Sequence, residues 1–407
     1  MNVTIHPGTP KGVFVAPPSK SVAHRLLICA ALAPGTSEIA NVAPCEDILA
    51  TIDCLRILGA VIRTDWVSGK VTVTGAHPAQ RTAEALPCRE SGSTLRFLLP
   101  LCLFAPRPAL LCGSERLLQR PLTVYEQLGQ THGFSVRHTP EGIRVKGSLR
   151  GGVYTMRGDV SSQFITGLLA ALPLCETDSE IRLLPPVESR SYIALTLHAL
   201  SAFGVKAFFR DENTITVPGN QVYRPGVHAV EGDYSGAAFF FGMNTMGAHI
   251  QIQGLQADSC QGDRIVVDYL KKLEQDTPTL SLQDCPDLAP ILFAVAGVRN
   301  GAVFTQTRRL AIKESDRGEA MRQELAKCGI TVVSEENRIT VYPAQPHPPS
   351  EPICSHNDHR IVMAMAALLT LTGGEIRGCE AVAKSMPDFF EKLKMLGIAM
   401  ENDDTDK

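Results

Sequence analysis

The stretch SKSVAHRLLICAALAPG, residues 19–35, decides the fold because variants of it occur six times along the chain. Each variant begins with a small polar cluster, continues as a run rich in Ala, Leu and Met, and reaches Gly or Pro before a short alternating stretch. The clusters begin at Ser19, Ser91, Ser161, Asp233, Cys285 and Asn357. The runs have the composition of buried helices, and stretches such as SEIANV and GEIRGC have the period of β-strands.

The spacing of these starts indicates a repeated structural unit. Successive starts are 72, 70, 72, 52 and 72 residues apart, so only the fourth interval is short. This period is too long for a solenoid repeat and fits a small α/β unit. A second, amphipathic helix is expected in each unit, at residues 48–58, 122–128, 192–203, 264–273, 317–328 and 389–396. The sequence therefore predicts an α/β protein of six similar units.

Composition excludes several classes of protein. The 407 residues carry 39 Lys+Arg against 42 Asp+Glu, a net charge of −3 that argues against a nucleic-acid coat or a polybasic membrane protein. The longest apolar runs fall below the roughly 18 residues that a membrane span needs. The twelve cysteines are scattered without a C-x-x-C pair, which disfavours a zinc site and favours a reducing cytoplasm.

The polar starts of several runs also carry cationic side chains, such as Lys20 and Arg25 in the first run and Arg360 in the last. Helix N-termini offer free N–H groups and a positive dipole end, so helix starts that converge with such cations would form an anion site. Each cluster alone has a plainer interpretation, since Asp358 can be only an N-cap and residues 313–317 only a solvated helix start. Their joint occurrence in five of the six repeats favours a function.

The usual motifs of nucleotide hydrolysis, nicotinamide chemistry, zinc proteolysis and serine hydrolysis do not occur. The polar strings instead resemble, in order from residue 17 to about residue 397, those of the 3-phosphoshikimate 1-carboxyvinyltransferase (EPSP synthase) family. The strings are PSKSxxxR, ESGSTLRF, QRP, SSQF, ESRSYI, VEGDxS, QGD, PDxAP, KESDR, NDHR and KSxPDFF. Any one of them is weak, but eleven in family order make a specific resemblance.

The resemblance implies an EPT/RTPC-like fold, an inside-out α/β barrel. This fold has two similar domains, each of three βαβαββ units packed around buried parallel helices. One domain is expected at residues 15–228 and the other at residues 1–14 plus 229–407, with the active site in the cleft between them. Closure of the two domains on binding charged substrates is also expected, with a hinge near residues 14 and 228.

The reaction implied by the resemblance moves the enolpyruvyl group of phosphoenolpyruvate to the 5-hydroxyl of shikimate 3-phosphate by addition and elimination, releasing phosphate. It needs no cofactor and no metal. The residues placed around phosphoenolpyruvate are Lys20, Gly92, Arg120, Gln163, Arg317, Arg360 and Lys384. Those placed around shikimate 3-phosphate are Lys20, Ser21, Arg25, Ser161, Ser162, Gln163, Ser189, Tyr192, Asp287 and Lys313.

Four residues are expected to carry the chemistry. By the resemblance, Asp287 accepts the hydroxyl proton, Glu314 delivers a proton to the methylene carbon and later removes one, and Lys313 and Lys384 stabilise developing charge. Two positions depart from the common family pattern. Arg309 stands four residues before the Lys-Glu pair, where many members have Asn, and His24 also replaces a common Asn. A contact to shikimate 3-phosphate from position 309 is therefore left open.

Two alternative functions remain to be weighed. The UDP-N-acetylglucosamine enolpyruvyl transferases share the fold, but they typically have Lys-Asn in the first cluster and a loop Cys before the Arg. This chain has Lys20-Ser21, and residues 114–119 contain no Cys. A phosphosugar-binding homologue without catalysis is disfavoured because the four catalytic residues are all present. We expect a cytoplasmic monomer whose partners are the two small substrates, with no nucleic acid and no membrane.

Overall fold

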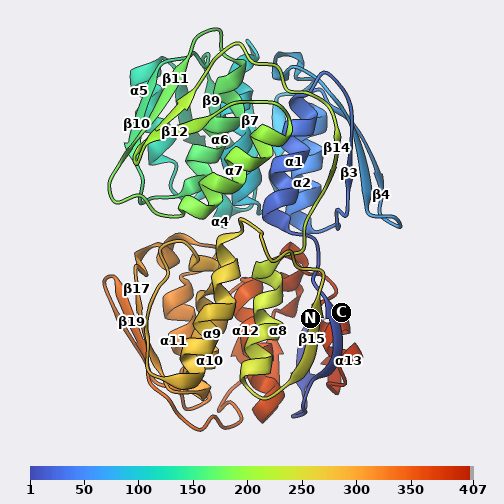
Figure 1. The fold of residues 1–407 in the computed structure, drawn as a ribbon, viewed down its shortest axis with the longest axis vertical. Coiled ribbons are helices and arrows are strands. Elements are labelled where there is room, and N and C mark those ends of the chain that lie inside the picture. Colours follow the sequence, from blue (N-terminus) through green and yellow to red (C-terminus); the bar gives the residue numbers. More distant parts are fainter. Residues whose placement is uncertain (404–407) are drawn as a thin grey trace. The chain divides into compact units, whose positions relative to one another are not determined.

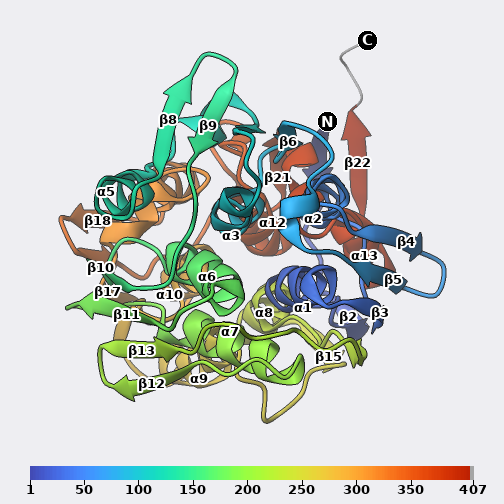
Figure 2. The ribbon, with the colours of Figure 1, turned by 90° about the horizontal axis from the view of Figure 1, so that it is seen from above.

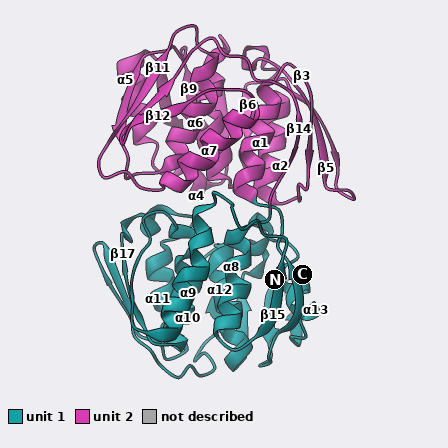
Figure 3. Cartoon of the chain, in the orientation of Figure 1, with its two compact units in different colours: residues 1–19, 232–407 teal, residues 20–231 magenta. Residues whose placement is uncertain are grey.

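The computed structural model describes residues 1–403, which form two compact units (Figure 3). One unit contains residues 1–19 and the chain from residue 232 onward, and the other contains residues 20–231. The boundaries expected from the resemblance lay a few residues earlier, at 14/15 and 228/229. Residues 16–18 stay with the first unit because Ala16 N donates to Gln253 O at 2.9 Å, Asp233 N donates to Pro17 O at 2.8 Å, and Pro18 bridges to Gly232.

The unit of residues 20–231 holds three repeats. Its helices are α1 (Lys20–Leu32), α2 (Glu46–Ile57), α3 (Gly92–Leu98), α4 (Glu115–Leu118), α5 (Thr123–His132), α6 (Ser162–Ala171) and α7 (Arg190–Ala202). Its strands are β3 (Gly35–Ala40), β4 (Val61–Asp65), β5 (Lys70–Gly75), β6 (Ala85–Pro87), β7 (Ala109–Cys112), β8 (Ser135–Thr139), β9 (Gly142–Lys146), β10 (Val153–Arg157), β11 (Ser179–Leu184), β12 (Phe208–Asp211), β13 (Thr214–Val217) and β14 (Val227–Ala229).

The unit that contains residues 1–19 holds the other three repeats. Its helices are α8 (Tyr234–Thr245), α9 (Val266–Gln275), α10 (Ala289–Val298), α11 (Arg317–Lys327), α12 (His359–Thr372) and α13 (Phe389–Met395). Its strands are β1 (Asn2–Ile5), β2 (Lys11–Val15), β15 (His249–Gln253), β16 (Thr279–Ser281), β17 (Ala302–Thr305), β18 (Val332–Glu335), β19 (Arg338–Val341), β20 (Ile353–Cys354), β21 (Gly374–Arg377) and β22 (Met400–Asp403).

Within residues 1–403 the strands form six sheets, three in each unit. Five have four strands with one pattern, in which a parallel pair is extended by an antiparallel pair, as in β16-β17-β19-β18. In the sheet β20-β21-β1-β22, the third position is taken by β1 from the start of the chain. The sixth sheet is only the parallel pair β2-β15. The short fourth interval has its explanation here, because α9 leads after a few residues into β16 with no intervening hairpin.

The apolar runs form the buried helices that the sequence predicts. Figure 1 shows α8, α10 and α12 side by side in their unit, where all three contact one another, and Figure 2 views the helices nearly end-on. Two runs are shorter as α-helices than expected. They continue as 3₁₀ turns, η2 (Pro100–Phe104) and η3 (Leu172–Leu174), because proline cannot donate the i→i−4 hydrogen bond of an α-helix. No helix of the described chain is long and apolar enough to span a membrane.

The polar cluster at the head of a run is usually the helix cap. The side chains of Ser91, Ser161, Asp233 and Asp358 accept backbone N–H groups at 2.9–3.3 Å from the first turns of α3, α6, α8 and α12. These caps satisfy donors that a helix start leaves without intrahelical partners. The capping interpretation is therefore correct for these residues, and any functional role is additional to it.

Candidate active site

Asp287 is the centre of a cluster of cations in the unit that contains residues 1–19. It lies in the 3₁₀ turn η5 (Pro286–Leu288), just before the buried helix α10. Its Oδ1 accepts from Lys313 Nζ at 3.1 Å and from Arg317 Nη1 at 2.7 Å, and its Oδ2 accepts from Arg360 Nη2 at 3.2 Å. Arg360 Nη1 also donates to the Asp287 carbonyl at 3.1 Å. Four residues expected at the site, from two successive repeats, thus meet at one carboxylate.

These contacts shift the proton affinities of both partners. Burial favours the neutral form of Asp287, but Arg360, Lys313 and Arg317 outweigh it and hold the pKa of the carboxyl well below its usual range. For Lys313, burial is again the largest influence and lowers the pKa of the amine to about 8, with Arg317 and Arg309 adding to this effect against Asp287. The cluster therefore holds a weakly basic carboxylate and a lysine that loses its proton readily.

A second buried pair orients Arg317. Its Nε donates to Asp358 Oδ2 at 2.8 Å and its Nη2 to Asp358 Oδ1 at 3.3 Å, and Ser315 Oγ donates to the same Oδ2 at 3.0 Å. Asp358 is fully buried and Arg317 is 2% exposed. Burial disfavours the charge of Arg317, but Asp358 and Asp287 overcome this and raise its pKa. Asp358 is thus both the cap of α12 and the partner that fixes the Arg317 guanidinium.

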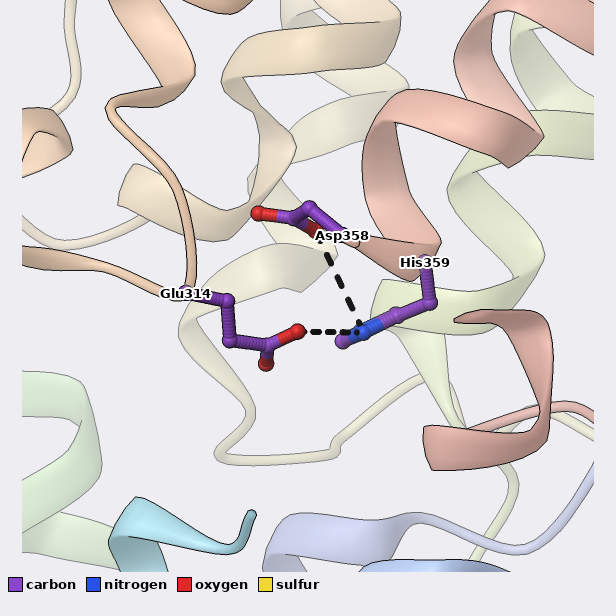
Figure 4. Close-up of side chains that lie close together, drawn as sticks. All are labelled: Glu314, Asp358 and His359. Carbon is purple, nitrogen blue, oxygen red and sulfur yellow. Dashed lines mark hydrogen bonds and ion pairs between the residues drawn. The ribbon is translucent and has the colours of Figure 1, made fainter. Parts of the chain in front are cut away.

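Glu314 lies beside the ring of His359. His359 Nδ1 is 2.9 Å from Glu314 Oε2 and 4.0 Å from Asp358 Oδ1, and Figure 4 shows both carboxylates directed toward the same ring nitrogen. These three side chains could supply ligands to a metal ion. Two of the hydrogen bonds to Asp358 already come from the guanidinium of Arg317. The ring of His359 therefore orients the carboxyl group of Glu314, whereas Asp358 is held by Arg317.

Two further cations border this cluster. Lys384 lies in η7 (Cys379–Lys384), and its Nζ donates to Asn357 O at 2.6 Å, one residue before the cap of α12. Arg309 lies in η6 (Arg308–Ile312), is 6% exposed, and donates from Nη2 to Gln283 O at 2.5 Å. Arg309 thus supports the backbone four residues before Asp287. A contact of Arg309 to substrate stays an open prediction.

The unit of residues 20–231 contains the other expected residues. Lys20, at the start of α1, pairs through Nζ with Asp47 Oδ2 at 2.8 Å. Arg25, one turn further on, is buried and donates to Thr196 Oγ1 at 2.9 Å, to Ser21 O at 2.7 Å and to Tyr192 O at 3.1 Å. Arg25 thereby joins α1 to α7, and Ser21 and Tyr192 contribute backbone carbonyls to that junction.

Gly92 and Gln163 lie on neighbouring helix starts in the same unit. A Cβ atom at Gly92 would stand 2.3 Å from Arg120 Nη1, so only glycine allows this guanidinium against the start of α3. Gln163, in the first turn of α6, accepts from Arg96 Nη1 at 2.7 Å and donates to Ser93 Oγ at 3.0 Å. The contacts bring α3 and α6 together at their N-termini.

The remaining serines expected at the site lie at the starts of α6 and α7. Ser161 caps α6, and Ser162 follows it as the first residue of that helix. Ser189 precedes α7 with φ of 57°, in the left-handed region that non-glycine residues seldom occupy. Such backbone strain persists only where the surroundings enforce it, and it often marks functional positions.

Several residues that the sequence reasoning left out of the site are in it. Asp47 holds Lys20, Asp358 holds Arg317, His359 holds Glu314, and Arg96 holds Gln163. Burial, together with the nearby Arg120, lowers the pKa of Arg96 well below its usual range. Asp358, His359 and Arg96 belong to the quoted motifs, so motif membership was an available signal for them. No local signal marks Asp47, which reads as an ordinary acidic residue in the first turn of α2.

Buried cations at the helix starts of a six-repeat α/β protein, together with a partly buried carboxylate and a titratable lysine, define an enzyme that handles small anionic substrates. The sequence matches the family described as EPSP synthase (3-phosphoshikimate 1-carboxyvinyltransferase) over residues 7–280 and 275–393. A 3-phosphoshikimate 1-carboxyvinyltransferase of Clostridium kluyveri is 37% identical, with 97% of each chain covered. A 3-phosphoshikimate 1-carboxyvinyltransferase of Clostridium acetobutylicum is 36% identical, again with 97% of each chain covered.

A solved structure of EPSP synthase from Acinetobacter baumannii superimposes with a TM-score of 0.79, at 26% identity, covering 98% of this chain and all of that one. The chain belongs to the EPSP synthase family. The fold that the motif resemblance implied, two similar domains of three α/β units each, is thereby confirmed.

Proposed function

We propose that the side chains gathered around Asp287 and at the helix starts of residues 20–231 carry out the reaction of this family. The chain is a transferase that moves the enolpyruvyl group of phosphoenolpyruvate to the 5-hydroxyl of shikimate 3-phosphate, a step of the shikimate pathway toward chorismate and the aromatic amino acids. The observation that carries the assignment of roles is the partly buried Asp287, whose carboxylate accepts hydrogen bonds from Lys313, Arg317 and Arg360.

Substrate binding would turn Asp287 into a useful base. With three cations in contact, its pKa lies well below the usual range, and a general base works best when its pKa is near the operating pH. The carboxylate and phosphate of phosphoenolpyruvate compete for the same guanidinium groups, which suit such groups by bidentate contact. As Arg317 and Arg360 engage the substrate, their hold on Asp287 weakens and its pKa rises. Asp287 then accepts the proton of the attacking 5-hydroxyl.

Glu314 is the proposed acid for the methylene carbon, and the same group takes a proton back in the elimination. Its contact with His359 keeps the carboxyl in one orientation. Lys313 and Lys384 stabilise charge as the tetrahedral adduct forms and collapses. Lys313 suits this role because its pKa of about 8 lets it share a proton with the reacting groups at neutral pH.

The two substrates are held by the sets of residues predicted from the motifs. Around phosphoenolpyruvate we place Lys20, Gly92, Arg120, Gln163, Arg317, Arg360 and Lys384. Around shikimate 3-phosphate we place Lys20, Ser21, Arg25, Ser161, Ser162, Gln163, Ser189, Tyr192, Asp287 and Lys313. Both sets contain residues of each unit. We further propose a monomer acting in the cytoplasm, for which a sedimentation measurement at the assay concentration is the direct test of oligomeric state.

Phosphate release from phosphoenolpyruvate in the presence of shikimate 3-phosphate tests the proposal. Asp287→Asn and Glu314→Gln should each lower kcat about 10²- to 10⁴-fold, the range for loss of a general acid or base. Glu319→Gln is a matched control, because Glu319 is a half-exposed carboxylate on α11 that pairs with Arg322. Near-normal turnover in Asp287→Asn or Glu314→Gln would refute that residue's role. Turnover only with UDP-N-acetylglucosamine as acceptor would instead favour the related transferase.

A further inference from the structure

The segment of residues 355–357 connects β20 to α12 and directly precedes the cap residue Asp358. His356 and Asn357 have φ of 49° and 51°, so two successive non-glycine residues adopt the left-handed conformation. Such residues are uncommon, and two in a row persist only where other contacts enforce them.

Glu324 is the residue that holds it from one side. It lies on α11 and is 1% exposed. Its Oε1 is 2.8 Å from His356 Nε2, and its Oε2 accepts from Cys354 N at 2.9 Å and from Lys327 Nζ at 2.7 Å. Burial acts to raise the pKa of Glu324, but the hydrogen bonds from His356, Lys327 and the Cys354 amide outweigh it and lower the pKa. The side chain is therefore a charged acceptor that binds the backbone of residue 354, just before the segment, and the side chain of His356 within it.

The same helix holds the far end of the segment as well. Arg317 and Glu324 are seven residues apart on α11, which is two helical turns, so both side chains leave one face. Arg317 fixes Asp358 just beyond the segment, while Glu324 fixes His356 within it. Between these two points lies Asn357, whose carbonyl oxygen accepts from Lys384 Nζ at 2.6 Å. The position of that acceptor, and hence of the Lys384 amine, depends on the conformation of the segment.

We propose that Glu324 and His356 are positioning residues for the transfer reaction, which hold residues 355–357 so that the Asn357 carbonyl presents Lys384 to the reacting groups. The inference rests on the proposed role of Lys384. His356 serves as the donor through Nε2. Both the charged ring and the neutral ring with its proton on Nε2 can make this contact. Neither residue touches the reacting atoms in this scheme.

The test compares His356→Ala with His356→Gln, since the amide of Gln reaches Glu324 with a donor at a similar position. His356→Ala should lower kcat roughly 10- to 100-fold, as small misplacements of a reacting group do, without changing KM for shikimate 3-phosphate. His356→Gln should restore most of the loss. Hydrogen exchange in residues 353–358 should accelerate in the Ala variant alone. Arg322→Ala, which removes an exposed ion pair with Glu319 on the same helix, should match the unmodified chain.

A double-variant cycle separates this inference from the role of Lys384 itself. If His356 acts through Lys384, then His356→Ala should cause little further loss of kcat in a Lys384→Ala background. An equal additional loss there, a normal kcat in His356→Ala, or a failure of Gln to restore activity would overturn the inference while leaving the role of Lys384 intact. Normal kcat in Lys384→Ala would refute that role and the positioning route with it.

Discussion

Replacing Asp358 by asparagine should destabilise the unit of residues 1–19 and 232–403 strongly, although the two side chains have the same shape. Asp358 is fully buried, and its oxygens accept from Arg317 Nε at 2.8 Å and from Ser315 Oγ at 3.0 Å. The substitution leaves the Arg317 guanidinium buried with one anionic partner fewer, and removing one member of a buried ion pair costs about 3–5 kcal/mol. An asparagine Oδ1 can still cap α12, so the lost stability comes from the missing negative charge and not from a missing cap.

Urea unfolding followed by far-UV circular dichroism is the suitable assay, because the single tryptophan, Trp66, lies in the other unit. With a urea slope of about 2 kcal/mol/M, a loss of about 3–5 kcal/mol lowers the midpoint by about 1.5–2.5 M. Asp388→Asn is the control, since Asp388 is 49% exposed and its pair with Lys392 contributes at most about 1 kcal/mol. A midpoint for Asp358→Asn within about 0.3 M of this control would refute the reasoning.

Three further predictions concern other groups. Since the pKa of Lys313 is about 8, kcat/KM should fall as the pH rises through 8, and Lys313→Arg should move that fall to higher pH; an unmoved profile would contradict the role of its charge. Burial lowers the pKa of His24 from 6.5 to about 3, so its contribution to stability is complete above pH 6.5 and is lost as the pH falls below that value. At about 1.4 kcal/mol per pH unit, His24 should reduce the unfolding free energy by about 2 kcal/mol at pH 5, and His24→Asn should remove this pH dependence in urea titrations at pH 5 and pH 8. Equal pH dependence in both proteins would count against a buried neutral imidazole. Gly167→Ala places a Cβ 2.3 Å from Tyr125 Oη and should lower the free energy of unfolding by about 1–3 kcal/mol. An unchanged Tm would show that α5 and α6 can move apart without loss of stability.

The local parts of this fold were predictable because their causes are local. Ser91 and Ser161 cap helices through their own hydroxyl groups, and the apolar runs behind them have no polar face to expose, so both features follow from a few consecutive residues. The short stretches behind the runs are local in the same way: in β11, Ser179–Leu184, buried side chains alternate with more exposed ones.

The pairings across the chain were not predictable in this way. Arg317 contacts Asp358, 41 residues away in the sequence, and His356 contacts Glu324, 32 residues away. From the sequence alone, each of these side chains could equally face solvent. Which side chains meet depends on how α11 packs beside the start of α12, and periodicity carries no such information. Family motifs named Arg317 and Lys384, yet Glu324 lies outside every quoted motif and only its burial with three hydrogen-bond donors reveals it.

The strand β1 has a consequence for how the chain is made on the ribosome. Its residue Val3 pairs with Ile376 on one side and Asn402 on the other, and β2 pairs with β15. Residues 2–5 therefore emerge long before their neighbours, residues 374–377 and 400–403, are synthesised. Residues 20–231 form an uninterrupted segment that can fold meanwhile. The inserted segment can therefore fold first, whereas residues 2–5, which are synthesised before it, are placed in their sheet after it.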